Sequence, residues 1–283
     1  MEDALALSEG LERLRPRRRR IAKPKRIIYR QRGGTKEHPL ERYKSIWLWM
    51  AIPLVAMQAT IFVDYWGDFA RNTWAVHVHY WIATAWYVLL ISQPWLFSRG
   101  RMDAHRTWGI FGIGVAGAFA FTSISQLNRD IVTADFVIAN PGAIGPFEAW
   151  FFMGIMFTEI ILVSAFIAAI IMAVIRRKSI QDHAWWLVST VFIIMFPAMG
   201  RGLQALFIAI YGLEPDIDIV VMVPIFLGQI LIIVMTIGVA AYLKVLRHPA
   251  TYLAVFANLA VFLTEPLGRS QFLQDLARAI IKA

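Results

Sequence analysis

Long apolar segments alternate with short polar segments along most of the chain. Each of the six longest could cross about 30 Å of hydrocarbon as an α-helix. They are residues 45–64, 74–97, 107–127, 148–175, 184–211 and 219–243. The pattern therefore predicts an all-α, polytopic integral membrane protein whose six transmembrane helices form a bundle over residues 45–247.

The last 36 residues, 248–283, carry a weaker apolar pattern. The segment TYLAVFANLAVFLTEPLG is of marginal length for a span, and SQFLQDLARAIIKA follows it. In the final segment one helix face is apolar and the opposite face is polar, as in helices that lie on a membrane surface. The apolar face comprises Phe272, Leu273, Leu276, Ala277, Ile280 and Ile281. We expect interfacial amphipathic helices here, because a seventh span would move Arg269, Arg278 and Lys282 to the outer side.

Basic residues in the connections indicate the orientation, because short cytoplasmic loops collect Lys and Arg. If the N-terminal segment is inside, 22 Lys and Arg residues lie on the inner side, and only Arg71 and Arg129 lie outside. With six spans, this distribution predicts that both termini are cytoplasmic.

Composition supports a membrane protein and localises the charge. Hydrophobic residues make up 58% of the chain and charged residues 17%, with no cysteine and a mean hydropathy of +0.57. Residues 1–44 hold 14 Lys and Arg against 6 Asp and Glu, so they contribute most of the net charge of +9. This basic cytoplasmic tail, through residues 13–44, is suited to anionic lipid headgroups, and the remaining chain is too nearly neutral to indicate nucleic acid. The absence of cysteine excludes disulfides and thiolate metal sites.

Polar residues within the spans are costly in hydrocarbon and therefore indicate candidate sites. One cluster is expected in the outer half of the bundle, with Glu159 and Arg201 as an ion pair at its centre. It also comprises His79, Glu148, Gln93 and Gln126. Two interpretations stay open: a buried pair that fixes helix register, or a site for a ligand, a proton or a quinone. Pro197, one turn before Arg201, frees a backbone carbonyl and favours a site.

A second cluster is expected at the inner ends of the spans. His105 and His183 both begin spans on that side, and Gly112 and Ala116 follow His105 on the same helix face. One interpretation is two interfacial histidines that contact headgroups and loop carbonyls. The other is a b-type haem whose iron is ligated by both rings, with the small residues leaving space for the macrocycle.

Two stretches carry a resemblance to known families. HVHYWIATAWYVLLISQPWLFSRGRMDAHRTWGIFG contains a His-Arg-x-x-Gly span start, and HAWWLVSTVFIIMFPAMGR begins with a histidine and ends with Pro and Arg. This pattern resembles bacterial predicted membrane proteins of unknown function, which implies the bacterial inner membrane. More loosely, it is similar to six-helix transmembrane cytochrome b reductases. That similarity implies His105 and His183 as one haem pair and His79 as half of another, whose partner span here has no histidine.

Three functions follow from these features. The first is b-type haem binding and electron transfer with quinone or a cytoplasmic partner, which would make the protein an oxidoreductase. The second is a transporter or small-ligand binding protein with a polar pocket around Glu159 and Arg201. The third is an accessory or scaffold subunit anchored by its basic tail. Hydrolytic motifs such as HExxH, GxSxG and a Walker A loop are absent from the sequence.

Overall fold

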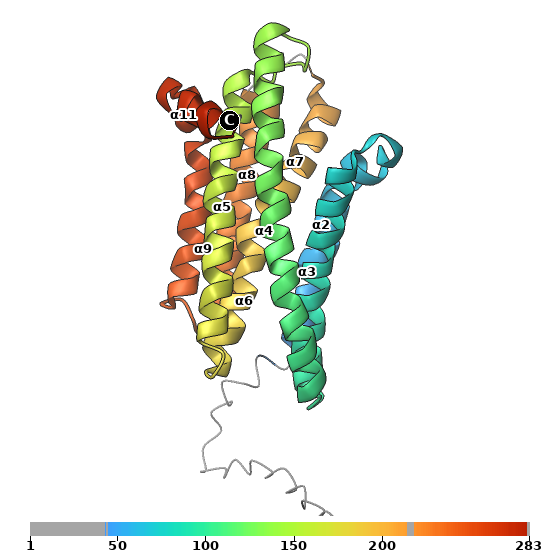
Figure 1. The fold of residues 1–283 in the computed structure, drawn as a ribbon, viewed down its shortest axis with the longest axis vertical. Coiled ribbons are helices and arrows are strands. Elements are labelled where there is room, and N and C mark those ends of the chain that lie inside the picture. The colour runs from blue at the N-terminus through green and yellow to red at the C-terminus, as the bar shows by residue number, and fades with distance from the viewer. Residues whose placement is uncertain (1–42, 44, 214–217, 282–283) are drawn as a thin grey trace, which may run out of the picture. The chain divides into compact units, whose positions relative to one another are not determined.

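The computed structural model describes residue 43 and residues 45–213 and 218–281, so nearly all of the predicted basic tail lies outside the described residues. All regular elements in the described part are helices (Figure 1). The α-helices are α2 (Ile46–Thr60), α3 (Trp74–Ser98), α4 (Met102–Ala139), α5 (Ala149–Ile175), α6 (Ile180–Ile194), α7 (Phe196–Tyr211), α8 (Val223–Tyr242), α9 (Pro249–Leu259), α10 (Thr264–Arg269) and α11 (Gln271–Ile281). Short turns complete them: η2 (Phe62–Trp66), η3 (Phe69–Arg71), η4 (Asp218–Met222) and η5 (Ala260–Leu263).

Six helical segments of the described chain are long and apolar enough to cross a membrane, which confirms the predicted class. These six segments differ from the six spans that the sequence predicted. The sixth is Pro249–Arg269, made of α9, η5 and α10, whereas the apolar helix α2 has only 15 residues. With α2 included, seven helical passes run along the bundle (Figure 1).

The prediction that residues 248–283 lie on the membrane surface is not supported for residues 249–269, because this stretch is long and apolar enough to cross a membrane and packs along the bundle. Helices α9 and α10 contact α5, α6 and α8. The indole of Trp185 in α6 donates to Thr251 Oγ1 at 2.9 Å, and both side chains are buried. Only α11, whose Phe272 and Ile280 are exposed, keeps the amphipathic character that was expected of the whole segment.

Glycines allow α10 to lie directly against α5. A Cβ at Gly154 would overlap the carbonyl of Thr264, and one at Gly268 would overlap the carbonyl of Trp150. Small residues at such crossings bring helix backbones into contact, which is the main source of helix association where no hydrophobic effect operates. This close crossing explains how an apolar run of marginal length is held in the bundle.

The start of α2 and helix α11 lie at opposite ends of the bundle. Helix α11 lies beside the C-terminal end of α4 (Figure 1), where Arg278 pairs with Asp135 at 3.0 Å. The first residues of α2 lie at the other end, with the connection between α3 and α4 (Figure 1). The prediction that both termini are cytoplasmic rested on six passes, and it stays a prediction.

The predicted span 184–211 is broken into α6 and α7 at Met195. Pro197 has no N–H, so the helical hydrogen-bond pattern cannot continue through it. The nearby carbonyl of Phe192 accepts from Asn258 Nδ2 of α9 at 3.2 Å. Asn258 Oδ1 in turn accepts from Gln229 Nε2 of α8 at 2.6 Å, and both side chains are fully buried. The break is thus stabilised by side chains from two neighbouring helices.

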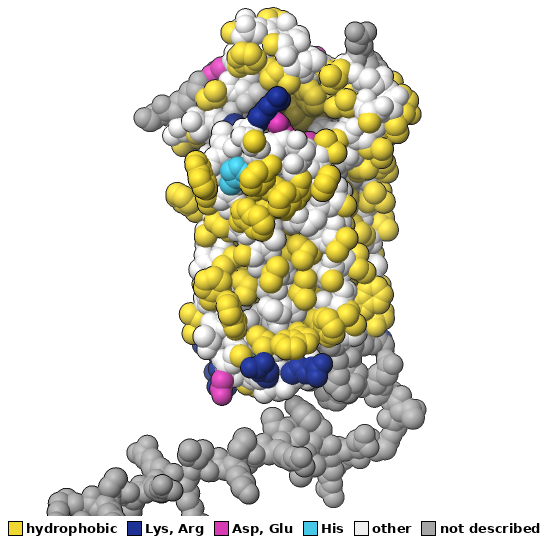
Figure 2. Space-filling view, turned by 90° about the vertical axis from the view of Figure 1, so that its right-hand side faces the viewer, with side chains coloured by type: hydrophobic (Ala, Val, Ile, Leu, Met, Phe, Trp, Pro, Cys, Tyr) yellow, Lys and Arg dark blue, Asp and Glu magenta, His cyan; other side chains and the backbone are white. Residues whose placement is uncertain are grey.

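Charged side chains gather at the two ends of the bundle, and the surface between them is largely apolar. Figure 2 shows hydrophobic side chains over the middle of one face and Lys and Arg along its lower edge. Near the upper end of the same face, Lys or Arg and Asp or Glu side chains meet beside a hollow (Figure 2). The candidate site lies towards this upper end, which is the end where α4 finishes and α5 begins.

Candidate functional site

Two cavities lie in the upper half of the bundle and share part of their walls. Their volumes are about 310 and 280 Å³. The first lies between α4, α5 and α7, and the second extends towards α2 and α3. Six residues line both: Asp64, Arg129, Glu159, Leu162, Pro197 and Arg201. The structure therefore brings the predicted Glu159 and Arg201 to one polar site, together with three charged residues that the sequence analysis did not include.

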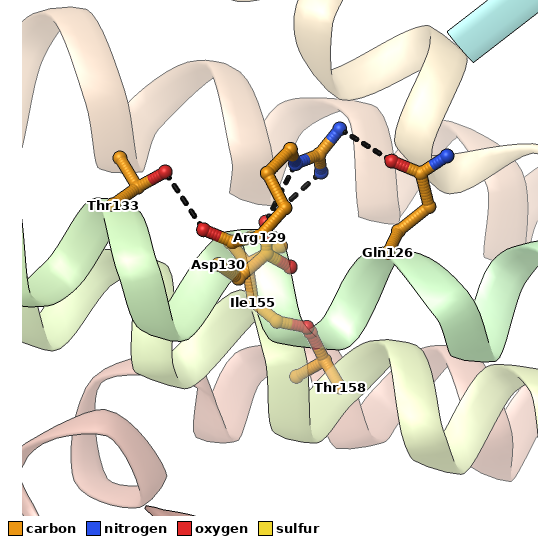
Figure 3. Close-up of polar contacts among 6 residues, drawn as sticks. All are labelled: Gln126, Arg129, Asp130, Thr133, Ile155 and Thr158. Carbon is orange, nitrogen blue, oxygen red and sulfur yellow. Dashed lines mark hydrogen bonds and ion pairs between the residues drawn. The ribbon is translucent and has the colours of Figure 1, made fainter. Parts of the chain in front are cut away.

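Polar side chains of α4 form one wall of the cavities and bond to one another (Figure 3). Arg129 donates to Gln126 Oε1 at 2.9 Å and to Asp130 Oδ1 at 2.9 and 3.2 Å. Asp130 is only 4% exposed, whereas the Arg129 side chain is 41% exposed. The Thr133 hydroxyl donates to the carbonyl of Arg129 at 2.8 Å. One guanidinium is thus committed to internal partners, and it holds the buried carboxylate in place.

The expected ion pair between Glu159 and Arg201 is not formed, which corrects the prediction. Both side chains line both cavities, but no hydrogen bond or ion pair joins them in the described structure. Glu159 Oε2 is buried and has no hydrogen-bond partner among the described residues. Arg201 lies on α7, beyond the break at Pro197, and its side chain is exposed. Both residues thus line the same two cavities without a direct bond between them.

His79 and Asp64 complete the polar surface on the side of α2 and α3. His79 Nδ1 lies 3.0 Å from Thr122 Oγ1 of α4, and its ring packs against Phe119. Asp64 lies on the turn after α2 and lines both cavities beside Arg201. His79 therefore belongs to the cavity wall, as predicted for the outer cluster.

Two other predicted residues lie elsewhere. Glu148 is exposed at the start of α5 and accepts from the indole of Trp150 at 2.9 Å, so it lines neither cavity. Gln93 lies near the C-terminal end of α3, about 20 Å along the helix from His79 at 1.5 Å per residue. This distance excludes it from the two cavities, although helical periodicity places it on the same face as His79.

No family model, curated protein or solved structure matches the chain.

His105 and His183 lie in the first turns of α4 and α6, but they bond to different neighbours. His105 Nδ1 is 3.3 Å from the carbonyl of Gln93 in α3, and His183 Nδ1 is 2.8 Å from the carbonyl of Ala173 in α5. A Cβ at Gly112 would meet Leu89 of α3 at 3.6 Å, which is an ordinary van der Waals distance. These contacts fit the interpretation of histidines bonded to carbonyls, and haem ligation stays a prediction.

The histidine of α9 that faces the same end has a structural role. His248 Nδ1 accepts from the backbone N–H of Ala250 at 3.1 Å, which caps the first turn of α9. His248 Nε2 lies 3.6 Å from Asp182. Burial lowers the pKa of His248, and the Asp182 carboxylate opposes this effect in part. The neutral ring is the form that can accept the capping hydrogen bond.

Arg129 and Asp130 were missed because span 107–127 was expected to end before them. Helix α4 instead continues to Ala139, three turns further, so the predicted loop is largely helix. The signal was present in the sequence: Gln126, Asp130 and Thr133 recur at helical spacing, and Ile131 and Ala134 form an apolar face beside them. Both apolar residues are fully buried in the structure.

Proposed function

We propose that the protein is a multi-pass membrane protein that binds a small polar ligand in the two joined cavities, as a transporter or a ligand-binding protein. The observation that carries this proposal is the state of Glu159 and Arg201. Both line the same cavities, yet neither has an internal ion-pair partner within the described residues. A charge inside a bundle is costly when it is unpaired, so a pair serving only to fix helix register would be expected to close.

The form of the cavities supports the same function. The first has an apolar part, which Phe147, Phe151, Phe152 and Phe196 line, and a polar part beside Asp130 and Glu159. Ligand sites combine an apolar wall with a few convergent polar groups in this way. Pro197 lines both cavities at the break between α6 and α7, and broken helices commonly border substrate sites in transporters.

We further propose that the end of the bundle with the α3–α4, α5–α6 and α8–α9 connections faces the cytoplasm of a bacterial inner membrane. These connections carry eight Lys and Arg residues within the described chain: Arg99, Arg101, Arg106, Arg176, Arg177, Lys178, Lys244 and Arg247. The cavities then lie in the outer half of the membrane. The basic tail would lie on the inner side, where its lysines and arginines suit anionic headgroups.

The proposal requires water-filled cavities, and the absence of cysteine from the chain allows a direct test. We expect Thr133→Cys and Ala198→Cys, which line the first and second cavity, to react with N-ethylmaleimide in the folded, detergent-solubilised protein. The reagent reacts with the thiolate, which forms only where water reaches the sulfur. Thr236→Cys and Ala240→Cys are matched controls, because both positions are fully buried and line neither cavity.

The control thiols should stay unreacted until the protein is unfolded in SDS. If the two cavity thiols are equally protected, the polar cluster is a sealed structural element and the proposal is wrong. Reaction of the cavity thiols alone supports a site that is open to solutes.

A further inference from the structure

The first cavity contains two carboxylate oxygens that no group of the described protein satisfies. Asp130 Oδ1 accepts from Arg129, but Asp130 Oδ2 is buried and has no hydrogen-bond partner there. Glu159 Oε2 is also buried and has no hydrogen-bond partner among the described residues. Asp130 comes from α4 and Glu159 from the neighbouring α5, and both line the first cavity. Buried carboxylate oxygens without donors are costly, so they indicate a donor that binds from outside the chain.

The balance of charge around the two cavities indicates the sign of that donor. The lining residues include three carboxylates, Asp64, Asp130 and Glu159, and two guanidinium groups, Arg129 and Arg201. Arg129 is engaged with Asp130, and Arg201 attracts both Asp64 and Glu159. With every group ionised, one negative charge stays uncompensated. This excess favours a ligand of net charge +1 over an anion or a zwitterion.

A hydroxyl that lines the same cavity as the two carboxylates adds a third acceptor. Thr158 of α5 lines the first cavity and donates to the carbonyl of Ile155 at 2.9 Å, which leaves lone pairs on its Oγ1 (Figure 3). A primary ammonium group has three N–H donors and no acceptor. Asp130 Oδ2, Glu159 Oε2 and Thr158 Oγ1 therefore offer one acceptor for each donor.

The remainder of the first cavity suits an apolar or aromatic body attached to the ammonium group. Four phenylalanines line it: Phe147, Phe151, Phe152 and Phe196. Aromatic faces attract organic cations as well as packing against apolar groups. The cavity volume of about 310 Å³ is at the small end of the range for organic ligands.

We propose that Asp130 and Glu159 bind the ammonium group of a small primary amine of net charge +1, whose body lies among the phenylalanines of the first cavity. This inference rests on the proposed function and names the chemical class of its ligand. Arg201, which lines the opposite wall on α7, is placed to donate to a neutral acceptor elsewhere on the amine.

Benzylammonium chloride is a suitable probe, because it combines a primary ammonium group with an aromatic ring. We expect it to raise the thermal unfolding midpoint of the purified full-length protein in a saturable manner. Benzyl alcohol, which has the same ring without the charge, and equal concentrations of sodium chloride should produce no such rise. Stabilisation by sodium chloride equal to that by the amine would overturn the proposal in favour of an inorganic cation.

Glu159→Gln should weaken benzylammonium binding at least tenfold, because it removes one charge while keeping the shape. This variant is expected to fold, since Glu159 Oε2 has no internal partner to lose. Glu148→Gln is the matched control on α5: it removes a carboxylate that lines neither cavity and should leave binding unchanged. Equal binding by all three proteins would show that the amine binds elsewhere and would overturn the assignment to Asp130 and Glu159.

The failure of this inference is distinguishable from failure of the proposed function. If the thiols at positions 133 and 198 react with maleimide but benzylammonium binds nowhere, the cavities admit solutes and the amine assignment is wrong. If those thiols are sealed, both proposals fail together.

Discussion

The carboxylates of Asp130 and Glu159 line one cavity but differ in their contribution to the stability of the fold. Asp130 compensates Arg129 within hydrogen-bond distance, whereas Glu159 Oε2 has no partner among the described residues. Removing one member of a buried ion pair is costly, because the other charge stays buried without a partner. Removing a charge that has no partner does not carry this cost. The two residues should therefore respond in opposite ways to neutralisation.

We expect Asp130→Asn to lower the free energy of unfolding by about 1–3 kcal/mol, because Arg129 loses its counter-charge. Glu159→Gln should leave stability unchanged or raise it. SDS titration of the purified proteins, followed by circular dichroism, measures both. A larger loss for Glu159→Gln than for Asp130→Asn would mean that Glu159 is a structural partner and would contradict the description of the site.

At the scale of the element, the contact between α5 and α10 decides whether residues 249–269 belong to the bundle. Gly154→Ala should destabilise the protein by roughly 1–3 kcal/mol, because the new methyl group overlaps the backbone of Thr264. Gly114→Ala is the matched control on α4, where a Cβ would meet nothing within 4 Å. Thermal unfolding in detergent should separate the two variants. Equal stability would mean that α10 does not pack on α5 as described.

Helical periodicity predicted most of the elements but not their ends or the position of the last pass. Apolar runs located α3, α5 and α8 closely. The end of α4 was placed 12 residues early, because Arg129 and Asp130 suggested a loop when they neutralise each other. The run after His248 was placed on the membrane surface because of the basic residues that follow it. The close crossing at Gly154 and Gly268, which holds this run against α5, depends on two helices at once. Contacts of this kind cannot be read from one segment alone.

Only part of the candidate site could be predicted from the sequence. Helix faces and depth brought Glu159, Arg201, His79 and Gln126 to one region, and all four line the cavities. The same reasoning did not predict the ion-pair geometry, because it gives the region of each side chain and not the distance between two charged groups.

At the scale of the whole molecule, the start of α2 and helix α11 lie at opposite ends of the bundle, which predicts that they lie on opposite sides of the membrane. We expect Ser270→Cys, between α10 and α11, to be labelled by a membrane-impermeant maleimide from the same side as Asn140→Cys at the end of α4. Ser179→Cys, at the start of α6, should be labelled only from the other side. Right-side-out and inverted vesicles distinguish the two. Labelling of positions 270 and 179 from one side would restore the six-pass arrangement.

The central claim is a water-accessible cavity with an excess of negative charge inside the membrane domain. Its most direct test is the rate at which Thr133→Cys reacts with a trimethylammonium methanethiosulfonate relative to a sulfonate of similar size. Asn140→Cys, which lies outside both cavities, is the reference. We predict a ratio about tenfold higher at position 133 than at position 140, and a loss of this preference when Glu159→Gln is added. Equal ratios at the two positions, or no reaction at position 133, would contradict the account.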